Sequence, residues 1–292
     1  MPPLNHSLME KISIVAADGY KLAAIFGQPV GDIYEVVVIS SATGIKKEFY
    51  INFAQFLVQK GCCVLFYDYR GIGESAPSDL RRSKIFMHEW GTLDMNAILD
   101  YLVYTKGFNK IVWLGHSIGA QLVGFLKNQQ YVKKVISVNA ALGYWGYFPF
   151  PMKAKVWLLW YVIGPLMIKF YGYGQMQKIG WGENLPKNTI LEWREWCTSK
   201  TYYSNFLKKE IGMDKFHNFK RPIKAFYLSD DYIANDRTAA LMMHFFPNAE
   251  SHLIKIDVRK YTNGKVGHVG IFRKRFEETL WPVLSEAILH EQ

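Results

Sequence analysis

The sequence predicts an α/β fold with a mostly parallel central sheet that is covered by helices on both faces. Short β-branched runs alternate with stretches of helical apolar spacing, and some runs, such as EVVVIS at 35–40, are apolar throughout. Strands buried on both faces have this composition, and strand–helix–strand alternation implies right-handed crossovers. With 292 residues, 50% hydrophobic and 21% charged, the chain can form one large domain with an insertion, or two small ones.

The individual elements follow from turn signals and apolar periodicity. Residues 11–27 are predicted to form a hairpin, because Asp18-Gly19 is a typical turn pair. Strands are then expected at 35–40, 62–70, 110–117, 132–142, 222–231 and 250–258. Helices are expected at 49–61, 92–107, 118–129 and 237–246.

The alternation stops between residues 143 and 220, a stretch dense in Trp, Tyr and Phe. We interpret this stretch as a helical, aromatic-rich lid, so that residues 1–142 and 221–292 form the core and 143–220 the cap. Residues 156–168 contain about 13 apolar residues, fewer than the roughly 20 needed to span a bilayer, and Gly164-Pro165 is expected to interrupt them. We therefore predict a buried or cap helix rather than a membrane anchor.

The formal net charge of +10 is compatible with nucleic acid, an anionic membrane surface or an acidic substrate. The closest basic runs, 80–84 (LRRSK) and 272–276 (FRKRF), are short, and a solvated basic surface explains them. Because no nucleic-acid-binding motif accompanies the charge, we predict no nucleic-acid partner.

The cysteines and the first residues indicate a reducing compartment. Cys62, Cys63 and Cys197 are odd in number and show neither a disulfide framework nor a zinc pattern. Residues 1–15 lack the basic and apolar regions of a signal peptide, so we expect a cytoplasmic protein.

Residues 115–119, Gly-His-Ser-Ile-Gly, fit the pattern G-x-S-x-G between a predicted strand and a predicted helix. This context is that of a nucleophile elbow, a sharp turn that exposes a serine hydroxyl. Small neighbours give the turn room, and the following helix directs backbone N–H groups toward developing negative charge. We predict Ser117 as the nucleophile; an ordinary turn with an N-capping serine is the alternative.

A serine nucleophile needs a base and an acid, which follow it in the order acid, then histidine, in sheets with such an elbow. Among the later histidines, His268 lies in a Gly-bounded loop after the last predicted strand, where parallel sheets carry their chemistry. It is our predicted base. Asp231, just after the strand at 222–231, is the predicted acid, with Asp230 as the alternative.

The oxyanion formed during acyl transfer needs two backbone donors. One is expected to be the N–H of Ile118, directly after the nucleophile, and the other to come from the loop after residues 35–40. That loop reads SATGIKKEFY, and we predict Thr43 as the donor, with Ala42 next.

With these motifs in view, the chain resembles the α/β-hydrolase superfamily, in particular the branch of monoacylglycerol lipases and serine-aminopeptidase-like lysophospholipases. GHSIG, VGHVGIF and the segment 67–75 (YDYRGIGES) carry the resemblance, which covers nearly the whole chain. Residues 41–50 and 182–197 look closer still to a poorly characterised bacterial group of predicted α/β-hydrolases. Most of the branch has a His-Gly pair where this chain has Ser41-Ala42. The resemblance also implies that segment 67–75 shapes the floor near the active site without reacting.

The resemblance implies an α/β-hydrolase fold and a serine hydrolase that cleaves small or lipid-like esters with an apolar acyl or alcohol part, without a cofactor. A thioesterase stays open, as does an aminopeptidase in which Glu192 or Glu195 would bind the substrate amine. The hypothesis from a different functional class is a protein that binds apolar ligands without catalysing a reaction. The sequence leaves open the oligomeric state and a transient contact of the lid with a membrane surface.

Overall fold

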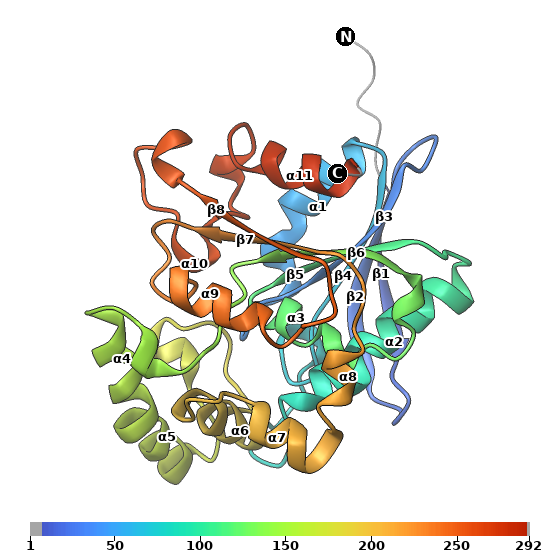
Figure 1. Ribbon diagram of the computed structural model, residues 1–292. Coiled ribbons are helices and arrows are strands. Elements are labelled where there is room, and N and C mark those ends of the chain that lie inside the picture. Colours follow the sequence, from blue (N-terminus) through green and yellow to red (C-terminus); the bar gives the residue numbers. More distant parts are fainter. Residues whose placement is uncertain (1–7, 291–292) are drawn as a thin grey trace.

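A computed structural model describes residues 8–290, so the first seven residues of the segment discussed for a signal peptide lie outside it. Eight strands form one sheet in the order β1-β2-β4-β3-β5-β6-β7-β8 (Figure 1). The strands are β1 (Leu8–Val15), β2 (Lys21–Gln28), β3 (Glu35–Ser40), β4 (Cys62–Tyr67), β5 (Ile111–His116), β6 (Val132–Val138), β7 (Ile223–Leu228) and β8 (Ser251–Ile256). β2 pairs antiparallel with β1 and β4, and all other pairs are parallel. The predicted fold class is confirmed.

The helices are α1 (Ile51–Gln59), α2 (Met95–Asp100), α3 (Ile118–Gln121), α4 (Met152–Leu158), α5 (Gly164–Tyr171), α6 (Lys187–Thr198), α7 (Ser204–Phe206), α8 (Asp214–His217), α9 (Asp236–Met243), α10 (Gly267–Gly270) and α11 (Trp281–Leu289). α1 and α11 lie on one face of the sheet, while α2 and α3 lie on the other (Figure 1). Each face has its own apolar core: Val37 and Ile39 of β3 point into the first, and Val36 and Val38 into the second. This explains why the central strands are apolar at every position.

Residues 143–220 contain α4 to α8, which lie beyond the sheet on the side of α3 and α9 (Figure 1). The division of the chain into a core and a cap stays a prediction. The expected break at Gly164-Pro165 is wrong: a wide π-type turn, Leu159–Ile163, joins α4 directly to α5. A wider turn moves the preceding carbonyls away from the proline ring, so that the helix continues past Pro165.

Two further predicted boundaries are wrong. The helix expected at 118–129 ends early, because the Asn96 side chain donates to the Phe125 carbonyl (3.0 Å) and accepts from the Lys127 N–H (2.8 Å). β6 ends at Val138 rather than near 142, because Asn139 adopts a φ of 54°. No helix within residues 8–290 is long and apolar enough to cross a membrane.

Candidate active site

Ser117 lies on a sharp turn between β5 and α3, with φ 53° and ψ −115°. The turn depends on its two glycines: a Cβ on Gly115 would lie 2.4 Å from the Ala120 nitrogen, and one on Gly119 would lie 2.3 Å from the Ser40 carbonyl oxygen. A positive φ at serine costs about 1–3 kcal/mol and persists only where the surroundings impose it. The Ser117 hydroxyl makes no capping hydrogen bond to α3, which removes the N-cap interpretation.

The structure brings Ser117, Asp231 and His268 together from the segments that follow β5, β7 and β8, with His268 in the short helix α10. The His268 Nε2 atom lies 3.0 Å from the Ser117 Oγ, and its Nδ1 atom lies 2.6 Å from an Asp231 carboxylate oxygen. The Asp231 side chain is 1% exposed and that of His268 is 18% exposed. The three groups therefore form a line from a buried carboxylate to a hydroxyl at the edge of a cavity.

The two neighbouring aspartates point to different partners. The second carboxylate oxygen of Asp231 accepts the N–H of Ile233 at 2.8 Å, which holds the carboxylate in place. Asp230 instead accepts the N–H groups of Val266 and Gly267, at 2.7 and 3.0 Å. Asp230 thus stabilises the loop that carries His268, but it does not contact the imidazole.

A buried chain of hydrogen bonds connects the loop after β3 to the loop of His268. The N–H of Ala42 donates to the Tyr50 hydroxyl (3.0 Å), and that hydroxyl lies 2.7 Å from the His116 Nδ1. The His116 Nε2 lies 2.9 Å from the His268 carbonyl oxygen. These partners require a neutral imidazole that accepts at Nδ1 and donates at Nε2. Burial, and after it the charge of His268, lowers the pKa of His116 to about 3, which keeps that form.

Asn139 extends this chain toward the loop of the acid. Its amide nitrogen donates to the same His268 carbonyl at 2.8 Å, and its amide oxygen accepts the N–H of Leu228 at 3.2 Å. The sequence reasoning missed Tyr50, His116 and Asn139. The position of His116 beside the serine was the one available signal, since nothing in the sequence shows which distant groups it meets.

Thr43 and Ile118, the two predicted oxyanion donors, line the same cavity as Ser117 and His268. The N–H of Ala42, the alternative donor, is taken by the Tyr50 hydroxyl. Within the described part of the chain, no acceptor is recorded for the N–H of Thr43 or of Ile118. The arrangement therefore leaves these two backbone groups available to a ligand.

The cavity at Ser117 has a volume of about 330 Å³ and mostly apolar walls. Gln121 and Tyr202 form a polar pair in it, the Tyr202 hydroxyl donating to the Gln121 amide oxygen at 2.9 Å. Lys155 of α4 is the lysine at its edge. The large apolar residues of the lining are Ile45, Ile118, Phe148, Met152, Val156, Trp160, Trp181, Trp193, Ile233 and Val269.

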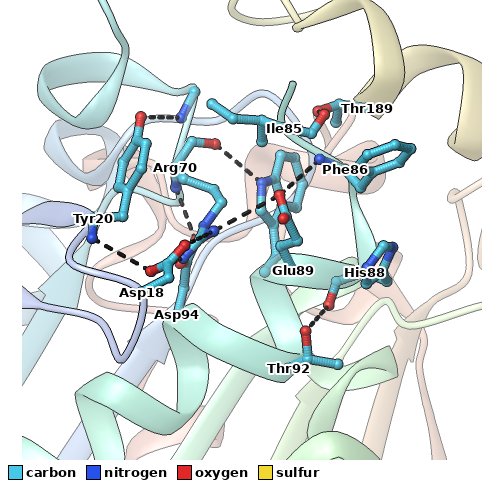
Figure 2. Close-up of polar contacts among 12 residues, drawn as sticks. Asp18, Tyr20, Arg70, Ile85, Phe86, His88, Glu89, Thr92, Asp94 and Thr189 are labelled. Atoms are coloured by element: carbon cyan, nitrogen blue, oxygen red, sulfur yellow. Dashed lines mark hydrogen bonds and ion pairs between the residues drawn. The ribbon is translucent and has the colours of Figure 1, made fainter. Parts of the chain in front are cut away.

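The segment 67–75 lies outside this cavity, contrary to the expectation that it shapes the floor. Arg70 is buried and binds Asp94 at 2.7 Å and Asp18 at 2.8 Å, as Figure 2 shows. Asp68 and Lys47, both buried, pair at 2.7 Å. These ion pairs therefore hold segment 67–75, which includes the loop after β4, in place. The segment has a structural role and does not line the cavity.

Glu192 and Glu195, the candidate amine-binding residues, are not part of the cavity lining. Glu192 binds the N–H of His88 at 2.9 Å and its Nδ1 at 2.8 Å. Beside it, Thr189 donates to the Ile85 carbonyl, and both residues appear in Figure 2. These contacts attach α6 to the loop 85–88. Within residues 8–290, no group of three or more His, Cys, Asp or Glu side chains is placed to hold a metal ion.

The comparisons with known proteins agree with this fold. A family model described as alpha/beta hydrolase fold matches residues 35–164. No curated protein sequence matches the chain significantly. Together with the strand order and the solved structures below, the match shows that this chain has the α/β-hydrolase fold.

Several solved structures are similar over nearly the whole chain. The esterase EaEST from Exiguobacterium antarcticum is 19% identical, with a TM-score of 0.64 over 96% of this chain and 100% of that chain. The Pyrococcus furiosus esterase Pf2001 is 14% identical, with a TM-score of 0.60 over 96% and 90%. The Pyrococcus horikoshii acylaminoacyl peptidase is 16% identical, with a TM-score of 0.59 over 97% of this chain and 41% of that chain. At such identities the similarity concerns the fold.

Proposed function

We propose that this protein is a serine hydrolase that cleaves carboxylic esters with an apolar acyl or alcohol part, using Ser117, His268 and Asp231 as a catalytic triad. The observation that carries the proposal is the continuous contact from Asp231 through His268 to Ser117, at 2.6 and 3.0 Å, on the wall of an apolar cavity. A serine with an adjacent base that is oriented by a carboxylate has the geometry of an activated nucleophile.

The proposed reaction runs in two steps. The Ser117 oxygen bonds to the ester carbonyl carbon while its proton passes to the His268 Nε2. The bond between the carbonyl carbon and the alcohol oxygen then breaks, His268 gives the proton to that leaving oxygen, and the acyl group stays on Ser117. The oxygen of a water molecule then bonds to the acyl carbon while His268 takes its proton; the bond to the Ser117 oxygen breaks, and His268 returns the proton to that oxygen as the acid leaves. Asp231 keeps the imidazole in the needed tautomer and stabilises its charge.

The oxyanion of each tetrahedral intermediate would be stabilised by the N–H groups of Ile118 and Thr43. The use of the Ala42 N–H by Tyr50 supports Thr43 as the second donor. Removing one such donor from an enzyme of this kind costs about 10²–10³ in kcat.

The walls of the cavity favour an apolar ester over a substrate with a free amine. None of the residues recorded as lining the cavity is an Asp or a Glu, and Glu192 is engaged by His88. An aminopeptidase would need a carboxylate near the substrate amine. The esterases among the similar structures and the sequence resemblance to the monoacylglycerol lipase branch support the same choice.

A fluorophosphonate probe and a substrate screen test the proposal. The wild type should be labelled at Ser117 and should hydrolyse p-nitrophenyl esters, with rates that rise from acetyl to medium acyl chains. The screen includes an acyl thioester and an aminoacyl naphthylamide, which distinguish the thioesterase and peptidase readings.

Ser117→Ala should abolish labelling and lower kcat by at least about 10⁴, since the nucleophile is lost. Ser83→Ala, in a loop outside the cavity, is the matched control and should behave as the wild type. A wild type that binds apolar ligands but is neither labelled nor active would show a binding protein instead.

A further inference from the structure

The helix that runs from α4 through the wide turn to α5 has one side buried and an apolar side exposed. Val156, Leu159, Trp160 and Met167 are buried against the protein. The opposite side carries large apolar residues at helical spacing, and Phe170 is 69% exposed. We call this side, together with Phe150 just before α4, the α4–α5 face; its exposed residues are Phe150, Trp157, Leu158, Tyr161, Val162, Leu166 and Phe170.

A contiguous apolar patch of this kind on a protein surface marks an interaction site. Figure 1 places α4 and α5 at the outer edge of the molecule in that view. The buried side of the same helix contributes Met152, Val156 and Trp160 to the wall of the cavity at Ser117. One side of the helix thus packs against the protein, and the other side is exposed and can contact a partner.

The charges within residues 143–182, which contain this face, have one sign. Residues 143–182 include four lysines and no Asp or Glu. The Nζ of Lys169 lies 5.8 Å from the Phe170 ring centre, and that of Lys178 lies 4.8 Å from the ring centre of Tyr171. The cations therefore lie directly beside the exposed aromatic side chains.

The basic run at 80–84 adds to the same edge. A Cβ placed on Gly172, at the end of α5, would lie 3.6 Å from the Arg81 Cγ, so the aliphatic part of this arginine packs against the end of the helix. Arg81 and Lys84 are exposed, and Arg82 pairs with Asp79 at 3.5 Å. A run that looked like an ordinary solvated surface in the sequence borders the apolar face in the structure.

We propose that the α4–α5 face binds the surface of a membrane containing anionic lipids. Trp, Phe and Leu on one side of a helix, flanked by lysines, are typical of helices that lie in the interface plane, and anionic headgroups attract nearby cations. A symmetric contact with a second copy would bring together two faces that both carry lysines, with no carboxylate of residues 143–182 to meet them. Because its inner side packs on the protein, this helix would lie on the membrane surface and would not span the bilayer.

Vesicle flotation with the full chain tests the proposal without any turnover. The wild type should float with vesicles of phosphatidylglycerol and phosphatidylcholine, and about 10-fold less with phosphatidylcholine alone or at high salt. The variant W157S/L166S/F170S should bind the anionic vesicles about 100-fold more weakly, because three apolar side chains no longer enter the interface. K169Q/K178Q should lose about 10-fold on the anionic vesicles only.

The matched control is V30S/I33S, which removes two exposed apolar side chains from the loop between β2 and β3 and should float as the wild type does. Circular dichroism should show that all variants fold. The proposal is overturned if the wild type does not float, if the triple variant floats equally well, or if the control loses binding to the same extent. It is also overturned if the wild type is a dimer in sedimentation and the triple variant a monomer. Ester hydrolysis enters none of these readouts, so failure of the proposed function would be seen separately.

Discussion

The loops that carry the candidate triad and the helices that cover them are held by different interactions. Around Ser117 and His268, polar groups are joined by hydrogen bonds into a chain that includes Tyr50, His116 and Asn139. In residues 143–220 the contacts are mainly between aromatic rings, as in the Trp160–Trp193 pair with ring centres 4.9 Å apart. Directional hydrogen bonds fix positions closely, whereas apolar packing tolerates exchange of similar side chains. We therefore expect the segments that carry the candidate triad to be intolerant of change and residues 143–220 to be adaptable.

The largest effect should come from the acid, where two adjacent aspartates can be compared. Asp231→Asn removes the charge that orients and stabilises the His268 imidazole, and should lower kcat by about 10⁴, as the loss of a triad carboxylate does. Asp230→Asn leaves the contact between Asp231 and the His268 imidazole in place. It alters only the acceptors for the N–H groups of Val266 and Gly267. It should reduce kcat less than about 10-fold. Steady-state kinetics of both variants on one ester measure these kcat values. A larger loss of kcat in Asp230→Asn than in Asp231→Asn would show that Asp230 is the acid.

Gly119, two residues after Ser117, should show how little freedom the turn between β5 and α3 has. A Cβ on Gly119 would lie 2.3 Å from the backbone oxygen of Ser40, so Gly119→Ala must move β3 or α3. We expect a loss of about 3 kcal/mol in unfolding free energy. Gly264→Ala is the control, because the added Cβ would meet nothing closer than 3.5 Å. This substitution should change the unfolding free energy by less than about 0.5 kcal/mol. Equal urea midpoints for the two variants would contradict this account.

The elbow was predictable because its evidence is local: a strand, a serine between glycines and a helix follow one another in the sequence. Ser117, Asp231 and His268 could be selected because a parallel sheet brings the loops at its carboxyl ends together. The roles of Tyr50, His116 and Asn139 could not be predicted, since their partners are distant in sequence and depend on side-chain directions. The helix through Pro165 was mispredicted because a wide turn can absorb a proline, which propensity alone does not show.

The buried His116, next to Ser117, should make stability depend on pH. The pKa of His116 is lowered to about 3 in the fold from 6.5, by burial first and by the charge of His268 second, while the hydrogen bond to the His268 carbonyl and then the charge of Asp231 act against this. Below pH 6.5 the unfolded chain binds the proton and the folded protein does not, so stability is present above that pH and falls as the pH drops. From pH 6.5 to 5 the loss should be about 2 kcal/mol.

His116→Gln provides the comparison, because it removes this titration and leaves His268 unchanged. The difference in unfolding free energy between wild type and variant should shrink by about 2 kcal/mol between pH 6.5 and 5, as measured by urea unfolding. A difference that stays constant within about 0.5 kcal/mol would show that His116 is not buried in its neutral form.

The smallest effect concerns the attachment of α6, where two glutamates three residues apart can be compared. Glu192 binds His88 through both carboxylate oxygens, and its side chain is 8% exposed, whereas Glu195 is exposed. Glu192→Gln keeps a group that can hydrogen-bond but removes the charge, so we expect a loss of about 1 kcal/mol in unfolding free energy. Glu195→Gln should have no measurable effect. If aminoacyl naphthylamide turnover depended on either residue, the carboxylate would serve substrate binding rather than packing, and the attachment would have to be explained by Thr189 alone.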